Sequence, residues 1–108
     1  MLLSPKWRVA EHGTHVRDFI RALKDDRAFK DARALIDLLA ERGNRLKPPR
    51  SKPLGGGLFE LRGKQVRIFF TFRSGQRIVL LDGMVKKRDD IPPEVLARVR
   101  ALNDEVER

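Results

Sequence analysis

The amino-acid sequence predicts an α+β fold in which helices cover a single antiparallel sheet. Two observations support this prediction. Apolar residues recur at helical spacing in the first 40 residues and again after residue 92, and three short apolar segments separated by tight turns lie between these regions. A chain of 108 residues is the length of one domain with one modest core, so we expect residues 1–108 to form a single domain.

The N-terminal part predicts a short strand and two helices. Residues 7–10 are the expected strand, which ends at the turn around Gly13, and Thr14 is the expected N-cap of a helix that ends near residues 25–26. The apolar face of this helix consists of Val16, Phe19, Ile20 and Leu23. The second helix ends at Gly43. Its apolar face consists of Phe29, Ala32, Leu35, Ile36 and Leu39.

The middle of the chain predicts a basic loop followed by three strands. Residues 43–57 contain three prolines, a run of three glycines and four basic residues, a composition that interrupts regular structure and is typical of a loop. Hairpin-linked strands are expected at residues 58–62, 65–72 and 77–85. Because residues 78–81 are apolar at every position, the last strand is expected in the centre of the sheet, covered on both faces.

The C-terminal segment predicts a final helix. Pro92 and Pro93 are typical of the first turn of a helix. Its apolar face consists of Val95, Val99, Leu102 and Val106. The expected order of elements is therefore strand, helix, helix, three strands and helix.

The charge balance indicates a polyanionic partner. Lys and Arg total 24 against 15 Asp and Glu, which gives a formal net charge of +9 and a pI near 10.8. Such a surface attracts nucleic acid or an acidic protein; a merely solvated basic surface is the alternative. The absence of cysteine excludes disulfides and thiolate metal sites and is typical of a reducing compartment.

Two further features favour a soluble, cytoplasmic protein. The first six residues lack the apolar core of a signal peptide. No apolar run approaches the length of a membrane span. We therefore expect a cytoplasmic location and no membrane partner.

Four segments of the chain resemble a known toxin family. They are VRDFI at residues 16–20, KPLGGGLFELR at residues 52–62, RIFF at residues 67–70 and IVLLDGMVKK at residues 78–87. Together they resemble the HigB-like, phage-derived branch of the RelE/ParE superfamily of type II toxin–antitoxin systems. The resemblance covers nearly the whole chain, and it implies a RelE-like fold.

The resemblance also implies an activity and partners. Toxins of this kind are ribosome-dependent endoribonucleases, or mRNA interferases, which enter the ribosomal A site, cut messenger RNA and inhibit translation. They are neutralised by a cognate antitoxin, here expected to be HigA-like with a helix-turn-helix domain. ParE-type relatives with the same fold poison DNA gyrase, so the fold leaves the target open. A non-catalytic module that binds RNA or an antitoxin is a third possibility.

Metal-independent RNA cleavage needs a proton acceptor, a proton donor and positive charge beside the phosphate. Arginine suits the last role, because its planar group offers paired donors to phosphate oxygens and stays protonated. Arg62 and Arg67 flank a predicted hairpin turn and match the family's sheet arginines, so they are the first catalytic candidates. Glu60 shares a face with Arg62, since strand side chains alternate. We expect Glu60 either to transfer a proton or to form a structural ion pair.

The remaining candidates follow the last strand or lie in the basic loop. Lys86 matches a family position expected to hold RNA or to stabilise the leaving group, unless it is simply a solvated charge. Asp82 is a further candidate proton acceptor. The expected RNA-binding residues are Lys47, Arg50, Lys52, Arg73 and Lys87.

The chain departs from the family pattern at two positions. Phe70 stands where many members carry an aromatic hydroxyl, Asp82 stands where they carry histidine, and the sequence contains no tyrosine. Both histidines, His12 and His15, lie near the first turn and are expected to be turn or helix-start residues. Loss of one general acid or base lowers a rate by about 10²–10⁴, so a weakened enzyme is possible. No Walker loop, dinucleotide fingerprint or metal-ligand cluster occurs, so neither a cofactor nor a metal is expected.

Overall fold

The structure, a computed structural model, describes residues 6–107. In chain order its elements are β1 (Arg8–Glu11), α1 (His15–Ala22), α2 (Asp26–Arg42), the 3₁₀ turn η1 (Gly43–Arg45), β2 (Ser51–Gly55), β3 (Leu58–Arg62), β4 (Val66–Arg73), β5 (Arg77–Val85) and α3 (Pro93–Glu107). None of the helices within these residues combines the length and the apolar composition that a membrane span requires. The expectation about a signal peptide concerns mainly residues 1–5, which lie outside the described residues.

The five strands form one mixed sheet in the order β1-β5-β4-β3-β2. Neighbouring strands from β2 to β5 pair antiparallel, whereas β1 pairs parallel with β5. The sequence predicted an antiparallel sheet. This prediction was wrong for the edge strand β1, which pairs parallel with β5. Both helices and three strands separate β1 from β5, and such a long connection permits a parallel pairing that a hairpin does not.

The predicted basic loop contains a fifth strand. Ser51 to Pro53 pair antiparallel with β3, and the register shifts between Pro53 and Gly55. Because β2 has a neighbour on one side only, the missing N–H of Pro53 is tolerated there. The expectation of a loop across residues 43–57 was wrong here, because proline and glycine are depleted in strands but accepted at irregular edges.

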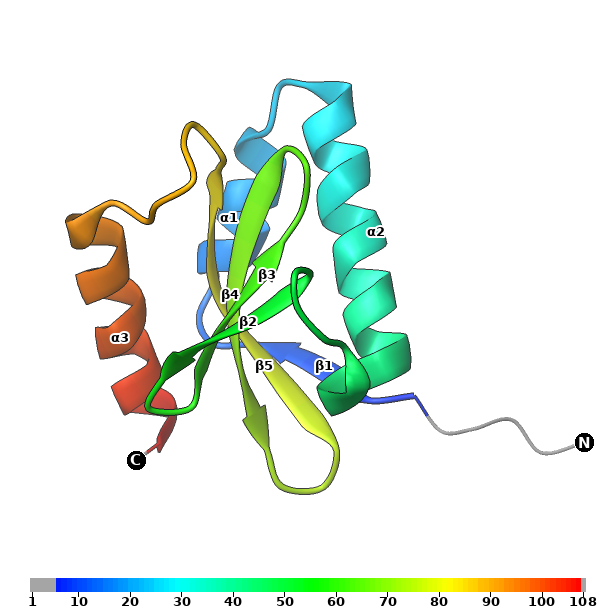
Figure 1. Cartoon of the computed structure of the whole chain (residues 1–108), viewed down its shortest axis with the longest axis vertical. Helices are drawn as coiled ribbons and strands as arrows, with labels where there is room; N and C mark the ends of the chain where they lie inside the picture. The colour runs from blue at the N-terminus through cyan, green and yellow to red at the C-terminus, as the bar shows by residue number, and fades with distance from the viewer. Residues whose placement is uncertain (1–5, 108) are drawn as a thin grey trace, which may run out of the picture.

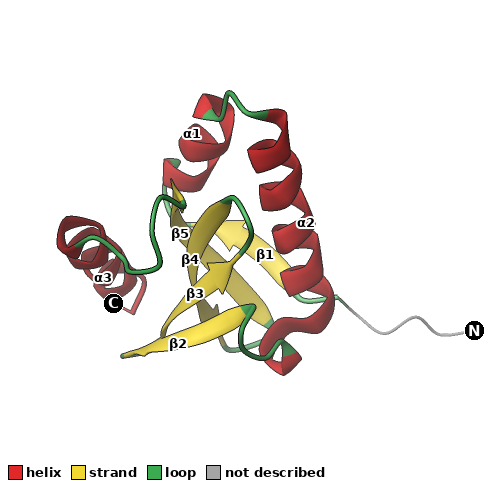
Figure 2. Cartoon of the chain, turned by 45° about the horizontal axis from the view of Figure 1, so that its top comes forward, coloured by secondary structure: helices red, strands yellow, loops and turns green. Residues whose placement is uncertain are grey.

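Helices cover both faces of the sheet (Figures 1 and 2). The helices α1 and α2 lie against one face, and α3 lies against the other. In β5, Ile78 and Leu80 belong to the buried cluster with α1 and α2, whereas Leu81 packs in the cluster with α3. The central, doubly covered position expected for this strand is therefore confirmed, as is the α+β class with a helix pair and a C-terminal helix.

The residues that cap the helices were partly predicted from the sequence. Gly43 ends α2 with a φ of 54°, and a side chain there would collide with the ring of Trp7. Thr14 occupies the expected N-cap position of α1, but its hydroxyl donates to the Asp18 carboxylate at 3.0 Å and caps no backbone group. Asp25 caps α2, because its carboxylate accepts the backbone N–H of Arg27 at 2.9 Å.

Candidate functional site

A hollow at one end of the sheet gathers basic side chains from three separate segments of the chain. It has a volume of about 260 Å³ and lies where the segment before β2, the β3–β4 turn and the end of β5 meet. Among the residues that the structure describes, those that line the hollow are Pro49, Arg50, Arg62, Gly63, Lys64, Arg67 and Lys86. We call it the cationic hollow, because five of these side chains are basic and none is a carboxylate.

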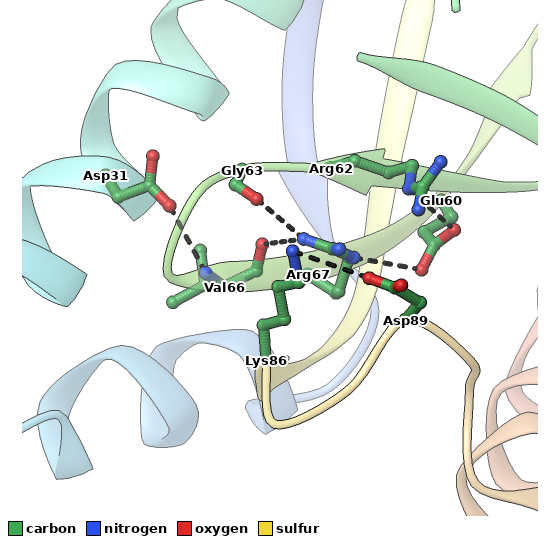
Figure 3. A network of polar contacts seen from close by, with 8 residues as sticks. All are labelled: Asp31, Glu60, Arg62, Gly63, Val66, Arg67, Lys86 and Asp89. Carbon is green, nitrogen blue, oxygen red and sulfur yellow. Dashed lines mark hydrogen bonds and ion pairs between the residues drawn. The ribbon is translucent and has the colours of Figure 1, made fainter. Parts of the chain in front are cut away.

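The two candidate arginines lie side by side. Arg62 and Arg67 are direct partners in the β3–β4 ladder, so their side chains emerge on the same face of the sheet. This is the face covered further along by α3, because Phe69, two residues from Arg67, packs in the α3 cluster. The hairpin therefore brings two guanidinium groups to one wall of the hollow. Figure 3 shows both side chains beside Glu60.

Glu60 lies behind this pair as a shared counterion. It is only 2% exposed. One carboxylate oxygen is 3.4 Å from Nε of Arg67, and the other is 3.6 Å from Nε of Arg62. These contacts favour the structural ion pair that the sequence left open, because the carboxylate is not part of the lining.

Arg67 is held in place by the backbone of the β3–β4 turn (Figure 3). Its Nη1 donates to the carbonyl oxygen of Gly63 at 2.6 Å and to that of Val66 at 3.3 Å. Burial lowers the pKa of the Arg67 guanidinium from its ordinary value, and the Glu60 carboxylate opposes this shift. A guanidinium remains protonated at neutral pH. Arg67 therefore places a fixed positive charge in a wall of the hollow that is largely shielded from water.

Lys86 closes the other side of the hollow. Its ammonium group is 3.7 Å from the Asp89 carboxylate, and about one third of its side chain is exposed. Its backbone N–H donates to the carbonyl of Gln65 at 2.9 Å, which ties the end of β5 to the β3–β4 turn. The ammonium can thus meet a ligand in the hollow while the backbone beneath it stays fixed.

The structure does not bring Asp82 into the hollow. Its carboxylate accepts from Nε of Arg98 on α3 at 2.8 Å and from the backbone N–H of Gly83 at 2.8 Å. The irregular pairing between β4 and β5 at Phe69 and Phe70 lies beside it. Asp82 therefore serves as an ion-pair partner for α3 in this arrangement.

Phe70 and the histidines also lie away from the hollow. Phe70 is fully buried in the cluster with α1 and α2, on the opposite face of the sheet, so a hydroxyl on this ring would face that core. His12 contacts Glu105 of α3 at 2.9 Å, and His15 begins α1. Because Phe70 lies on the opposite face of the sheet, an aromatic hydroxyl at this position would lie away from the hollow.

Of the five predicted RNA-binding residues, Arg50 lies in the lining of the hollow and the other four lie outside it. Arg50 lines the hollow, whereas Lys87 lines a separate apolar pocket beside Phe19. Lys47 and Lys52 are exposed. Arg73 lies at the other end of β4 and pairs with Glu107 at 3.6 Å.

Sequence reasoning missed one basic residue of the lining, Lys64. It occupies the tight turn between the two arginine-bearing strands, and that position was the signal that could have identified it. Within residues 6–107, no three His, Asp or Glu side chains gather as potential metal ligands.

Comparison with known proteins identifies a family and a fold. Residues 18–103 match the family model described as phage derived protein Gp49-like (DUF891). No curated protein sequence matches the chain.

Two solved structures share the architecture. A chain of the RelBE2 toxin–antitoxin complex from Mycobacterium tuberculosis is 19% identical, with a TM-score of 0.54; the match covers 80% of this chain and 98% of that one. A chain of the archaeal RelE–RelB complex from Pyrococcus horikoshii is 18% identical, with a TM-score of 0.51; the match covers 77% of this chain and 98% of that one. At these identities the likeness concerns the fold, and it confirms the RelE-like architecture. Because the family model spans more than half of the sequence, the chain belongs to the phage-derived Gp49-like family and has the RelE fold.

Proposed function

We propose that this protein is the toxin of a type II toxin–antitoxin system and that it cuts messenger RNA on the ribosome without a metal ion. One observation carries the proposal: Arg62, Arg67 and Lys86 line a single open hollow, in which Arg67 is buried and held by backbone carbonyls. Fixed cations of this kind stabilise a phosphate that gains negative charge during reaction.

The proposed reaction uses the RNA as its own nucleophile. The ribose 2′-oxygen forms a bond to the neighbouring phosphorus, and the bond from phosphorus to the 5′-oxygen breaks. The 2′-hydroxyl gives up its proton to a solvent water, and a proton from the protein reaches the departing 5′-oxygen. The products are a 2′,3′-cyclic phosphate and a 5′-hydroxyl. The protein must therefore bind the two non-bridging oxygens and protonate the leaving oxygen.

The lining residues divide these roles between them. Arg62 and Arg67 would donate to the non-bridging oxygens, for which the paired donors of a guanidinium are suited. Lys86, whose ammonium group is partly exposed, would protonate the leaving oxygen. Glu60 would keep both guanidinium groups aligned.

A cognate antitoxin is the second part of the proposal. One structural relative is a chain of the RelBE2 toxin–antitoxin complex, and the other is a chain of a RelE–RelB complex. For this chain we propose an antitoxin of the HigA-like, helix-turn-helix kind, a place in the HigB-like branch, and a cytoplasmic location where ribosomes are found. An acidic antitoxin segment would complement the net charge of +9.

Primer extension in a translating extract tests the proposal. Addition of the protein should produce new 5′ ends within translated messages, and the same RNA without ribosomes should stay intact. The cut fragments should carry a cyclic phosphate and a 5′-hydroxyl. Translated messages that remain whole while protein synthesis stops would remove the ribonuclease proposal.

Two further assays separate the alternatives. A ParE-like toxin would inhibit supercoiling by purified gyrase, whereas we expect supercoiling to continue unchanged. A pure binding module would lose no more toxicity from Arg67→Ala than from Lys47→Ala. We expect only the first of these substitutions to abolish toxicity, because Lys47 is exposed and outside the lining.

A further inference from the structure

The helix α2 contacts the β3–β4 turn through one carboxylate. Asp31 lies in the second turn of α2, and its Oδ2 accepts the backbone N–H of Gln65 at 2.8 Å and that of Val66 at 3.2 Å. Figure 3 shows the carboxylate pointing from the helix toward the turn. Hydrogen bonds to an ionised acceptor are among the stronger ones in proteins, so Asp31 ties the turn to α2.

The close approach of the helix depends on Gly63. A Cβ atom at Gly63 would collide with the carboxylate of Asp31 and with the side chain of Leu35. Leu35 is buried in the α2 core, and its position is therefore set by packing. The absence of a side chain at Gly63 is thus what allows the turn to lie against the helix at this point.

The same turn holds Arg67. The two carbonyl oxygens that accept from Nη1 of Arg67 belong to Gly63 and Val66. Val66 therefore links the two contacts directly: its N–H donates to Asp31, and its carbonyl accepts from Arg67. Val66 is fully buried, so its peptide groups have little freedom to find other partners.

We propose that Asp31 is a positioning residue, which fixes the Arg67 guanidinium in the cationic hollow by holding the β3–β4 turn against α2. Asp31 itself is not among the lining residues. The inference rests on the proposed function, because it takes Arg67 to be the group that meets the phosphate. A guanidinium released from this turn still carries its charge, but it no longer presents that charge in a fixed place.

Cleavage kinetics test the consequence for the reaction. Asp31→Ala removes the acceptor, whereas Asp31→Asn keeps an oxygen that can accept the same backbone groups without the charge. We expect Asp31→Ala to lower kcat by about 10²-fold with KM little changed, since a displaced catalytic group costs about this much. Asp31→Asn should recover most of this loss. Asp37→Asn, an exposed carboxylate on the same helix, is the matched control and should leave kcat unchanged.

Nuclear magnetic resonance tests the positioning without any activity. The Nε–H signal of Arg67, assigned by its loss in Arg67→Lys, should shift or broaden in Asp31→Ala, and the amides of Gln65 and Val66 should exchange faster with solvent. Gly63→Ala should produce the same changes, because it pushes the turn away from the helix. Circular dichroism shows whether each variant is folded.

The outcomes separate this inference from the proposed function. If Arg67→Ala is inactive while Asp31→Ala cleaves like the wild type, the positioning role is overturned and the ribonuclease remains. If the wild type cleaves nothing, the proposed function fails and the Arg67 signal alone decides the inference. If the Arg67 signal is the same in Asp31→Ala and in the wild type, the positioning role of Asp31 is contradicted.

Discussion

The carboxylate of Glu60 is enclosed by two guanidinium groups in a part of the sheet that water hardly reaches. The side chains of Glu60 and Arg67 are each only 3% exposed, and their charged atoms are 3.4 Å apart. Bringing these charges out of water is costly, but removing only one of them leaves the other buried without compensation. Replacing one member of the pair is therefore expected to destabilise the fold more than replacing both members.

Glu60→Gln is predicted to destabilise the fold. The substitution leaves Arg62 and Arg67 facing each other without a negative charge, and we expect the free energy of unfolding to fall by about 3 kcal/mol. Urea denaturation followed by circular dichroism measures this change. Glu41→Gln on the exposed side of α2 is the control and should shift the midpoint little. Equal midpoints for both variants would show that the buried pair contributes no stability.

The main cationic residues could be predicted from local sequence because a hairpin fixes their relation. Arg62 and Arg67 flank a short turn, and strand geometry alone places them on one face. The contact of Asp31 with the turn could not be predicted, because it depends on how a helix 34 residues earlier packs on the sheet. Asp82 was one candidate proton acceptor in the sequence, whereas long-range packing gives it Arg98 as an ion-pair partner.

At the scale of single elements, α2 begins with a charged cap. The carboxylate of Asp25 accepts the backbone N–H of Arg27, and this hydrogen bond lowers the pKa of Asp25 from its ordinary value of 3.8. A carboxyl whose pKa is lower in the folded state stabilises the fold above its unfolded pKa and loses that effect as the pH falls through the folded pKa.

The contribution of this cap is predicted to depend on pH. Asp25→Ala should lower Tm at pH 7, whereas Asp25→Asn should lower it less, because asparagine can also cap. The difference in Tm between the wild type and Asp25→Asn should be constant above about pH 5 and should narrow as the pH falls below about 4, since the wild-type carboxylate then gains a proton. Thermal melts in buffers from pH 7 to pH 3 measure it. A difference that grows on acidification would contradict the assigned role of the charge.

The helix α3 holds the glycine turn between β2 and β3. Nδ2 of Asn103 donates to the carbonyl of Gly56 at 2.9 Å, and Nη2 of Arg100 donates to that of Leu54 at 2.8 Å. Asn103→Ala should lower the free energy of unfolding by about 1–2 kcal/mol, because the part-buried hydrogen bond from the Asn103 side chain to Gly56 is lost. Asp104→Ala, at the next and exposed position, is the comparison in guanidinium denaturation. A smaller loss for Asn103→Ala than for Asp104→Ala would disprove the contact's importance.

The elements differ in how well their own sequences predict them. Periodicity predicted the three helices and the hairpin strands β3 to β5, because their apolar residues face a core at regular spacing. It failed for β2, whose five residues, Ser51–Gly55, include a proline and a glycine and lie at the sheet edge. The parallel pairing of β1 with β5 could not be predicted, since nothing local to either strand determines it.

At the scale of the whole molecule, the fold gathers several of the basic side chains around the cationic hollow. The net charge of +9 attracts any polyanion, but the sheet brings five cations from three segments around one hollow. The β3–β4 hairpin that forms its wall lies between α2 and the loop leading to α3 (Figure 1). The binding of RNA should therefore depend on these residues more than on the rest of the surface.

The salt dependence of RNA binding is predicted to report these contacts. Each phosphate contact on a single strand contributes about −0.7 to the slope of log K against log salt concentration, so five contacts give a slope of about −3.5. Arg50→Ala should reduce its magnitude by about 0.7, whereas Arg33→Ala on the exposed side of α2 should not. Fluorescence anisotropy with a labelled single-stranded RNA measures both slopes. Identical effects of the two substitutions would show that binding is spread over the whole surface.

The most direct test of the catalytic role that we propose for Arg67 is single-turnover cleavage of messenger RNA on purified ribosomes. We predict that Arg67→Ala lowers the cleavage rate by about 10²–10³-fold while ribosome binding persists, because it removes a fixed donor to the phosphate. Lys47→Ala, an exposed residue outside the hollow, should change the rate by less than about threefold. Rates for Arg67→Ala and Lys47→Ala that are equally close to the wild type would contradict the account.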